Sequence, residues 1–383
     1  MLDPKQHRVG ILGCGGIATL HIHAYQAIGM PIVAGADISE EALQKVVNSF
    51  GIPRTYTSYV ELLEKEQPDI VSICTPPLPH REMAEVAVAN GVKAIVMEKP
   101  MAIDLDTADA MIEACERAGV IFIVNHQRRF CSQFMLARRW IDEGRIGVLE
   151  QIVAGVRGDL LHDGTHAIDL LRFCLQDLPV RRVFGIIERD GTNFYGTNNK
   201  RWPVGTRYGH PVESTALAEI IFENNIRAVL EVGHKIARPA LGGGDYGPPV
   251  RIYGSKGIIE VNTPGCALGA YDPKAQQSGG ARIAIFGQQL VVDPVIGTQV
   301  RDGWEAITFA EEGSNLGMVR SIEAMLDCMG RGINDHLLCA RSARADLEII
   351  MAIYESTHRK MGINFPVTFG HSPLQAMIEA GEI

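Results

Sequence analysis

The first third of the chain alternates short apolar runs with longer amphipathic segments. The apolar runs predict buried strands at 8–12, 31–36, 54–56, 69–74, 93–97 and 120–124. Apolar residues at three- and four-residue steps predict helices at 17–28, 40–50, 81–90 and 105–118. Gly91 and Gly119 follow two of these segments, where helices commonly end. Strands and helices that alternate in this order favour a parallel sheet.

The pattern changes after Arg129. It predicts a helix near 133–143, a strand near 148–157, a second helix near 165–175, long alternating strands at 215–222 and 226–233, and a terminal helix at 374–379. Asn224-Asn225 and the segment 254–257 are typical of hairpin turns. Alternation of this length favours an antiparallel sheet with helices on one face. Such a sheet usually finds a partner for its open face, so we expect a homo-oligomer.

The chain length supports two domains. At 383 residues it exceeds the usual size of one domain. We place a doubly wound domain at 1–125 and an α+β domain with a large, mostly antiparallel, open-faced sheet at 126–383, whose final helix could pack back on the first domain. Segments 190–210 and 237–250, rich in Gly, Asn and Pro, are expected to form long loops that act as binding lids.

Composition narrows the class of protein. Hydrophobic residues make up 46% and charged residues 21%, as in ordinary soluble enzymes, and the net charge is −9. This balance argues against nucleic-acid and membrane partners and favours a small-molecule ligand. The N-terminus lacks the features of a signal peptide, and we expect a cytoplasmic protein. The eight cysteines never lie within three residues of one another, so reduced thiols are expected rather than a zinc or redox motif.

The turn after the first predicted strand carries a glycine pattern. Its sequence, G-C-G-G-I-A at 13–18, joins a strand directly to a helix, so backbone N–H groups can surround a pyrophosphate. Gly13 permits the tight turn, Gly15 lets phosphates approach, and Ala18 lets helix pack on strand. The other residues of the turn expected to line a cofactor are Cys14, Gly16 and Ile17.

Asp37 strengthens this interpretation. It ends the second predicted strand, about 20 residues after the glycines, where a carboxylate binds the adenosine ribose hydroxyls. Ile38 and Ser39 follow, with no arginine to accept a 2′-phosphate, so NAD is favoured over NADP. The alternative is that Asp37 only caps the helix that begins near Ser39.

Two further segments follow predicted parallel strands, at the edge where such sheets bind ligands. In 74–80, Thr75 and His80 could contact the ribose or the nicotinamide, or the segment could be only a rigid turn; Cys74 and Pro76 are counted with the cofactor site. In 97–100, Lys99 could have a lowered pKa useful for proton transfer, although a surface lysine is the simpler interpretation. A cis bond before Pro100 would aim Glu98 and Lys99 into the cleft.

The segment 161–170 offers a base. If a helix begins near Gly164, His166 and Asp169 share a face, and the carboxylate could fix the imidazole tautomer. His166 could then remove a hydroxyl proton as hydride leaves the same carbon. His162, Asp163 and His166 could also suggest metal ligands, but a fourth ligand is missing, and no metal is expected.

These segments together resemble the glucose-fructose oxidoreductase/inositol dehydrogenase/MocA (Gfo/Idh/MocA) family along nearly the whole chain. The motifs that carry the resemblance are G-C-G-G-I-A at 13–18, Asp37, T-P-x-x-x-H at 75–80, E-K-P at 98–100, R-R-F at 128–130, G-T-H-A-I-D at 164–169 and G-S-K-G at 254–257. The ordered set is far more specific than any one of its members.

The resemblance implies a Rossmann domain, a second domain whose open sheet mediates oligomers, and NAD(P)-dependent oxidation or reduction at a secondary alcohol of a sugar, cyclitol or sugar derivative. Lys99 takes the place of the family's catalytic lysine and His166 that of its histidine. Members often carry Asp where this chain has His162, beside Asp163, so these two residues are candidates for catalysis and substrate binding, with Lys99 and His166.

Gln127 is a candidate cofactor contact and Arg128 a candidate substrate contact, although Arg128 and Arg129 could equally be a solvated pair. Two other functions remain open. One is a redox-neutral glycoside hydrolase or lyase that uses NAD for transient oxidation, and the other is a non-catalytic NAD-binding sensor.

Overall fold

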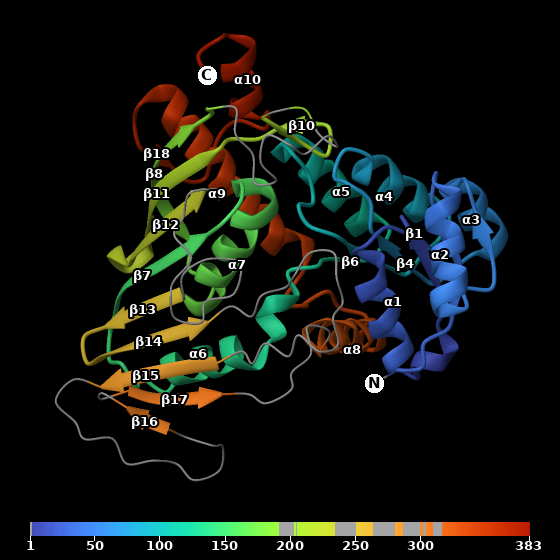
Figure 1. Ribbon diagram of the computed structural model, residues 1–383, viewed down its shortest axis with the longest axis horizontal. Coiled ribbons are helices and arrows are strands. Elements are labelled where there is room, and N and C mark those ends of the chain that lie inside the picture. Colours follow the sequence, from blue (N-terminus) through green and yellow to red (C-terminus); the bar gives the residue numbers. More distant parts are fainter. Residues whose placement is uncertain are drawn as a thin grey trace. The chain divides into compact units, whose positions relative to one another are not determined.

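The protein is described by a computed structural model that covers residues 2–190, 203, 205–233, 250–262, 280–285, 299–301, 304–308 and 316–383 (Figure 1). The chain divides into two compact units. Of the described residues, the first unit holds 2–127 and 316–347, and the second unit holds the rest. Most of the predicted loop 190–210, and 237–249 of the second predicted loop, lie outside the described residues.

The described strands of the first unit form one six-stranded sheet in the order β3-β2-β1-β4-β5-β6. These strands are β1 Val9–Leu12, β2 Ile32–Ala36, β3 Thr55–Tyr56, β4 Ile70–Ile73, β5 Ala94–Met97 and β6 Ile121–Val124. All neighbouring pairs are parallel. The predicted doubly wound sheet is therefore confirmed. The strand order reverses between β1 and β4, the point at which such sheets bind ligands.

The helices of this unit are the short 3-10 turn η1 Pro4–Gln6, α1 Ala18–Ala27, α2 Glu40–Phe50, α3 Tyr59–Glu66, α4 His80–Ala89, α5 Leu105–Arg117, α8 Leu316–Arg331 and the start of α9 Ala340–Arg359, which continues into the second unit. Helices α1, α2, α4 and α5 confirm the predicted alternation, whereas α3, α8 and α9 were not predicted. Ser39 caps α2 through Ala42 N–H, and Asp104 caps α5 through Thr107 N–H. Strands β1, β4, β5 and β6 are buried along their whole length, as helices on both faces of a parallel sheet require.

The large sheet of the second unit is mixed but mostly antiparallel, as predicted. Its described strands run in the order β16-β17-β15-β14-β13-β7-β12-β11-β8-β18. Their bounds are β7 Leu149–Val156, β8 Val180–Glu188, β11 Thr215–Phe222, β12 Arg227–Gly233, β13 Val250–Gly254, β14 Gly257–Asn262, β15 Gly280–Ile285, β16 Gln299–Arg301, β17 Trp304–Thr308 and β18 Ile363–Asn364. Only β12 with β7 is parallel among the described pairs of this sheet.

Both predicted hairpin turns are present. The turn between β11 and β12 is the short helical turn η4 Glu223–Asn225, in which Asn224 and Asn225 adopt φ of 66° and 64°. Asparagine tolerates this left-handed backbone better than most residues. In the second hairpin, Gly254 and Gly257 are paired where β13 meets β14.

Helices lie against one face of this sheet (Figure 1). The short turn η2 Gln127–Phe130 leads into α6 Ser132–Asp142, which contacts β14 and β15, and α7 Thr165–Cys174 contacts β7 and β12. The π-helical turn η3 Leu160–Gly164 runs directly into α7, and the last helix is α10 Pro373–Glu379. On β8 and β11, Phe184, Ile186 and Leu217 are exposed at alternating positions, so the sheet has an apolar face that these helices do not cover.

A small antiparallel pair, β9 Thr206–Arg207 and β10 His210–Pro211, stands within the segment predicted as a loop. Both Arg207 and His210 are buried. The described cysteines are free thiols, as expected. Among the residues described, we find no helix with both the length and the apolar character needed to cross a bilayer.

Candidate functional site

The glycine turn between β1 and α1 is tightly built on one side and open on the other. Gly13 has φ of 90°, and a Cβ at this position would lie 2.9 Å from the backbone carbon of Cys74. A side chain here would therefore push β1 and β4 apart at their carboxyl ends. At Gly15 and Gly16 a Cβ would meet nothing within 4 Å. The protein itself does not need glycine at these two positions, but a phosphate that approaches the backbone would.

Asp37 joins this turn to the end of β2. Its Oδ2 accepts a hydrogen bond from Cys14 N–H at 2.7 Å, and its Oδ1 accepts one from Ser39 N–H at 2.8 Å. The side-chain cap of α2 is Ser39, whose Oγ accepts from Ala42 N–H at 3.3 Å. Capping of α2 therefore does not account for Asp37. The neighbouring Ile38 is 94% exposed.

The cysteines of this region are inert thiols. Burial raises the pKa of Cys14 to about 12, with a further contribution from Asp37. Burial also raises the pKa of Cys74 well above its ordinary value. Both side chains therefore stay protonated at neutral pH, and any contribution to a cofactor site is through shape or backbone atoms.

His80 is fully buried at the start of α4. Its Nδ1 lies 3.1 Å from the carbonyl oxygen of Met101, and its Nε2 lies 2.9 Å from that of Thr75. Burial is the main cause of a lowered pKa for His80. The ring therefore links the 74–80 turn to the segment after Pro100. Its predicted contact with the cofactor stays a prediction.

Lys99 follows β5, is half-buried, and precedes a cis peptide bond to Pro100. The residue before it, Glu98, is buried and points into the first unit, where Oε1 accepts hydrogen bonds from His21 at 3.0 Å and Asn125 at 2.6 Å. Burial pushes the pKa of Glu98 upward, but these hydrogen bonds and Lys99 bring it below its ordinary value. Glu98 is therefore ionised and anchors the segment that carries Lys99.

Sequence reasoning missed the rest of this buried network. His21 Nδ1 lies 3.0 Å from Ser72 Oγ, which also lies 2.8 Å from the Tyr25 hydroxyl. His21 and Tyr25 are one turn apart on α1, and both are fully buried. The sequence feature that could have revealed the network is His21, a histidine on the inner face of a helix whose other inner residues are mostly apolar.

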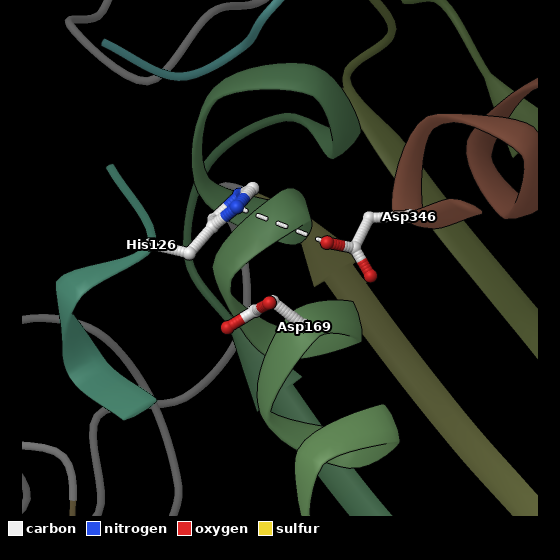
Figure 2. A group of neighbouring side chains, drawn as sticks. All are labelled: His126, Asp169 and Asp346. Carbon is white, nitrogen blue, oxygen red and sulfur yellow. Dashed lines mark ion pairs between the residues drawn. The ribbon is translucent and has the colours of Figure 1, made fainter. Parts of the chain in front are cut away.

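Another histidine of the first unit, His126, lies just after β6 (Figure 2). Its Nδ1 is 3.8 Å from Asp346 Oδ2 on α9, and both side chains are buried. Gln127 follows and is also buried. The partnership of His126 with Asp346 could not be predicted from the sequence, because 220 positions separate two residues that carry no common motif.

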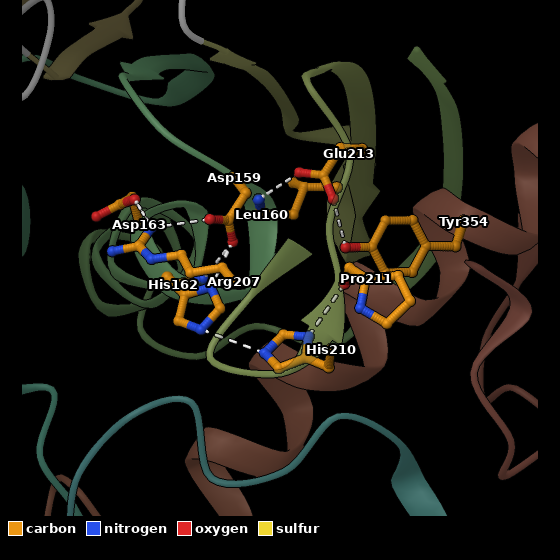
Figure 3. A network of polar contacts seen from close by, with 9 residues as sticks. All are labelled: Asp159, Leu160, His162, Asp163, Arg207, His210, Pro211, Glu213 and Tyr354. Carbon is orange, nitrogen blue, oxygen red and sulfur yellow. Dashed lines mark hydrogen bonds and ion pairs between the residues drawn. The ribbon is translucent and has the colours of Figure 1, made fainter. Parts of the chain in front are cut away.

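The second unit holds a buried polar cluster at η3 (Figure 3). Asp159, the residue before η3, accepts hydrogen bonds through Oδ1 from His162 N–H at 2.9 Å and from His162 Nδ1 at 2.7 Å. Arg207 on β9 donates from Nη1 to Asp159 Oδ2 at 2.8 Å and to Asp163 Oδ2 at 2.6 Å. The candidate residues His162 and Asp163 thus belong to one charged network with Asp159 and Arg207.

Burial sets the protonation of this cluster. It lowers the pKa of His162 to about 3, against the opposing effect of Asp159. It also lowers the pKa of His210, whose Nε2 is 3.3 Å from that of His162. Burial raises the pKa of Asp159, but His162 and Arg207 outweigh it and hold that pKa well below the ordinary value. The cluster therefore contains neutral imidazoles beside an ionised carboxylate.

His166 and Asp169 both lie on α7 and are buried, as predicted for a helix that begins near Gly164. Asp169 Oδ1 accepts a hydrogen bond from Arg129 Nε at 2.7 Å. Arg129 also donates to both oxygens of Asp177, at 2.8 and 2.9 Å. The alternative of a solvated arginine pair is wrong, because Arg128 is 5% exposed and Arg129 is 1% exposed.

Glu213 lies between η3 and α9, and the sequence did not predict a role for it. Its Oε1 accepts from Leu160 N–H at 2.5 Å, and its Oε2 accepts from the Tyr354 hydroxyl at 2.7 Å (Figure 3). Burial, followed by the charge of Asp159, raises the pKa of Glu213 to about 7. This carboxyl group therefore titrates near neutral pH and links η3 to α9.

The raised pKa of Glu213 makes stability depend on pH. The folded protein keeps this proton up to about pH 7, whereas the unfolded chain releases it near its ordinary pKa of 4.5. The free energy of unfolding therefore falls as pH rises between these values, by on the order of 3 kcal/mol from this group, and the loss is complete above them. Glu213→Gln, which stays neutral, should flatten that fall.

The measurement is urea unfolding at several pH values from 5.5 to 8. Glu223→Gln is the matched control, because Glu223 is exposed at the β11–β12 turn. If the Glu213→Gln and Glu223→Gln proteins both retain the pH slope of the wild type, Glu213 does not titrate in this range.

The geometry of the first unit defines a dinucleotide-binding domain, and comparison with known proteins agrees. Residues 7–126 match the family GFO_IDH_MocA, described as "Oxidoreductase family, NAD-binding Rossmann fold". Residues 7–126 therefore form an NAD-binding Rossmann domain of the Gfo/Idh/MocA oxidoreductase type. The resemblance noted in the sequence is confirmed over this segment.

Curated relatives agree over the same part of the chain. A D-apiose dehydrogenase from Paraburkholderia graminis is 38% identical over 144 residues, which are 37% of this chain and 38% of that protein. A myo-inositol 2-dehydrogenase from Thermotoga maritima is 31% identical over 141 residues, which are 37% of this chain and 42% of that protein. The matched part of this chain thus spans about two fifths of the length of these relatives.

Solved structures extend the likeness to the whole fold. A levoglucosan dehydrogenase in complex with NADH and levoglucosan has a TM-score of 0.75 at 18% identity, covering 94% of this chain and 99% of that chain. An oxidoreductase from Agrobacterium radiobacter in complex with NAD⁺, L-tartaric acid and magnesium has a TM-score of 0.71 at 19% identity, covering 94% and 98%. At these identities the likeness establishes the fold.

Proposed function

We propose that this protein is an NAD-dependent dehydrogenase that transfers a hydride between nicotinamide and a secondary alcohol of a sugar, cyclitol or sugar derivative. The observation that carries the proposal is the turn at 13–16, which is open above Gly15 and Gly16 and is tied to Asp37. Relatives named D-apiose and myo-inositol dehydrogenases support the substrate class.

The residues of the glycine turn fit an NAD pyrophosphate. Backbone N–H groups of 15–17 would bind its oxygens, because the start of α1 offers donors that no helical carbonyl satisfies. Asp37 would accept hydrogen bonds from the adenosine ribose, with Ile38 beside it. NAD supplies the hydride-accepting nicotinamide ring. Thr75, Pro76 and Gln127 are proposed to contact the nicotinamide half.

Two residues would carry the proton chemistry. His166 would accept the hydroxyl proton of the substrate, and the Lys99 ammonium would hold the same oxygen by a charge-assisted hydrogen bond. His162, Asp163 and Arg128 would orient the substrate around them. Glu98, fixed by His21 and Asn125, would hold Lys99 in place. Each of these roles needs a nicotinamide within reach of both Lys99 and His166.

Lys99→Ala and His166→Ala should each lower kcat by about 10² or more, because each removes a group that handles charge or protons in the transition state. NAD affinity, measured by calorimetry, should change little. The rate of NADH release gives kcat over a panel of sugars, inositols and sugar acids. The amount of NADH released per substrate consumed is measured in the same assays. Ser132→Ala, on α6, serves as a control variant.

Stoichiometric NADH release would distinguish a dehydrogenase from a redox-neutral hydrolase or lyase. Unchanged kcat in both the Lys99→Ala and the His166→Ala proteins would contradict the roles assigned to them.

Asp37→Ala should narrow the preference for NAD over NADP by at least about tenfold, because it removes two charged hydrogen bonds to the ribose and the repulsion of a 2′-phosphate. The measurement is the ratio of the two dissociation constants. Asp106→Ala, which removes an exposed carboxylate in the first turn of α5, should leave the ratio unchanged. An unaltered ratio in the Asp37→Ala protein would mean that this carboxylate only braces the turn.

We also propose that the chain forms a homodimer or homotetramer through the apolar face of the large sheet. Ile186 and Leu217 face each other across β8 and β11 and are 58% and 52% exposed. Ile186→Asp should lower the mass measured by sedimentation toward that of a monomer. Met135→Asp, at an exposed position on α6, should not. A monomeric wild type, or an oligomer indifferent to Ile186→Asp, would overturn this assembly.

A further inference from the structure

The imidazoles of His162 and His210 lie side by side inside the second unit, with nearly parallel ring planes (Figure 3). His162 Nδ1 lies 2.7 Å from the carboxylate of Asp159, and His210 Nδ1 lies 3.0 Å from the carbonyl oxygen of Pro211. Carboxylate and carbonyl oxygens only accept hydrogen bonds, so both Nδ1 atoms carry the proton. In each neutral ring, Nε2 is then a lone-pair donor. The two Nε2 atoms are 3.3 Å apart.

That separation is the one expected for two ligands of a tetrahedral metal ion. With metal–nitrogen bonds of about 2.05 Å, tetrahedral geometry places two ligand nitrogens about 3.3 Å apart and the centroids of coplanar imidazoles about 5.2 Å apart. Here the centroids of His162 and His210 are 5.0 Å apart, and the ring planes differ by only 18°. The separation of the two Nε2 atoms would thus allow both to bond one metal ion with little movement of either side chain.

A shared proton fits this separation less well. A hydrogen bond between the two Nε2 atoms needs one ring to become an imidazolium, and charge-assisted hydrogen bonds from nitrogen are about 2.7–2.9 Å long. The observed 3.3 Å is longer.

The surroundings resemble the outer shell of a metal site. Histidines that bind metals usually donate their other ring N–H to a carboxylate or a backbone carbonyl, and here His162 uses Asp159 and His210 uses Pro211. Asp159 and Asp163 both accept hydrogen bonds from the Arg207 guanidinium, so the carboxylate that orients His162 is itself held in place.

We propose that His162 and His210 bind a divalent transition-metal ion of the zinc class through their Nε2 atoms, with water or ligand hydroxyl oxygens in the remaining positions. The site does not rest on the proposed dehydrogenase activity. The sequence predicted no metal here, because it paired His162 with His166 by spacing and gave no sign that His210, 48 residues away, would lie beside it.

The experiment uses the full chain, stripped of metals with a chelator and then titrated with Co²⁺. Tetrahedral coordination should produce intense visible absorption that saturates at one ion per chain and is removed by Zn²⁺. His210→Gln should weaken Co²⁺ binding by at least about tenfold, because one of two protein ligands is lost. His358→Gln is the control, because His358 is a half-buried histidine on α9 that pairs with Glu382.

Thermal unfolding gives a second readout that does not depend on a spectrum. Excess Zn²⁺ should raise the Tm of the wild type and of the His358→Gln protein but not that of His210→Gln or His162→Gln. Equal Co²⁺ affinity in the wild type and the His210→Gln protein would overturn the site, as would no Co²⁺ spectrum at millimolar metal. Nitrogen NMR that finds one proton held between the rings, unaffected by Zn²⁺, would assign the pair to a proton instead.

Discussion

The hydrogen bond from Cys14 N–H to the Asp37 carboxylate, at 2.7 Å, is the interaction on which the organisation of the first unit depends. It ties the turn after β1 to the end of β2, while the contact of Gly13 with the Cys74 backbone ties the same turn to the end of β4. Three neighbouring strand ends are thereby held together around a turn that is open above Gly15 and Gly16. A parallel sheet brings its carboxyl ends to one edge, and these contacts give that edge a fixed shape.

The sequence predicted those parts of the fold whose pattern is local. All six strands of the parallel sheet were predicted within two residues of their observed bounds, because each is a short apolar run between turns. Helices α3, α8 and α9 were not assigned, and β9 with β10 fell in a predicted loop. Helix α3 has only eight residues, about two turns, so few positions can display its period, while β9 and β10 are two residues each, too short for an alternating pattern.

The candidate site divides in the same way. Gly13, Asp37 and Lys99 were identified because each carries its meaning in a short motif or at the end of a strand. Four buried residues were missed, because each acquires its role from a partner far away in the sequence. His21 and Asn125 bind Glu98, and His210 and Glu213 contact η3. Burial then decides their protonation, which no spacing rule encodes. The hydrogen bond from Arg129 to Asp169 was missed for the same reason.

In the proposed mechanism, the nicotinamide ring exchanges a hydride with a substrate carbon whose oxygen contacts both Lys99 and His166. The most direct measurement is a crystal structure of the protein with NAD⁺ and a polyol. We expect the pyrophosphate to lie against the backbone of 13–16 and the adenosine ribose hydroxyls to bind Asp37. We also expect the nicotinamide C4 to face a substrate carbon whose hydroxyl contacts both the Lys99 ammonium and the His166 imidazole. A bound NAD⁺ whose ring lies beyond the reach of either side chain would contradict this mechanism.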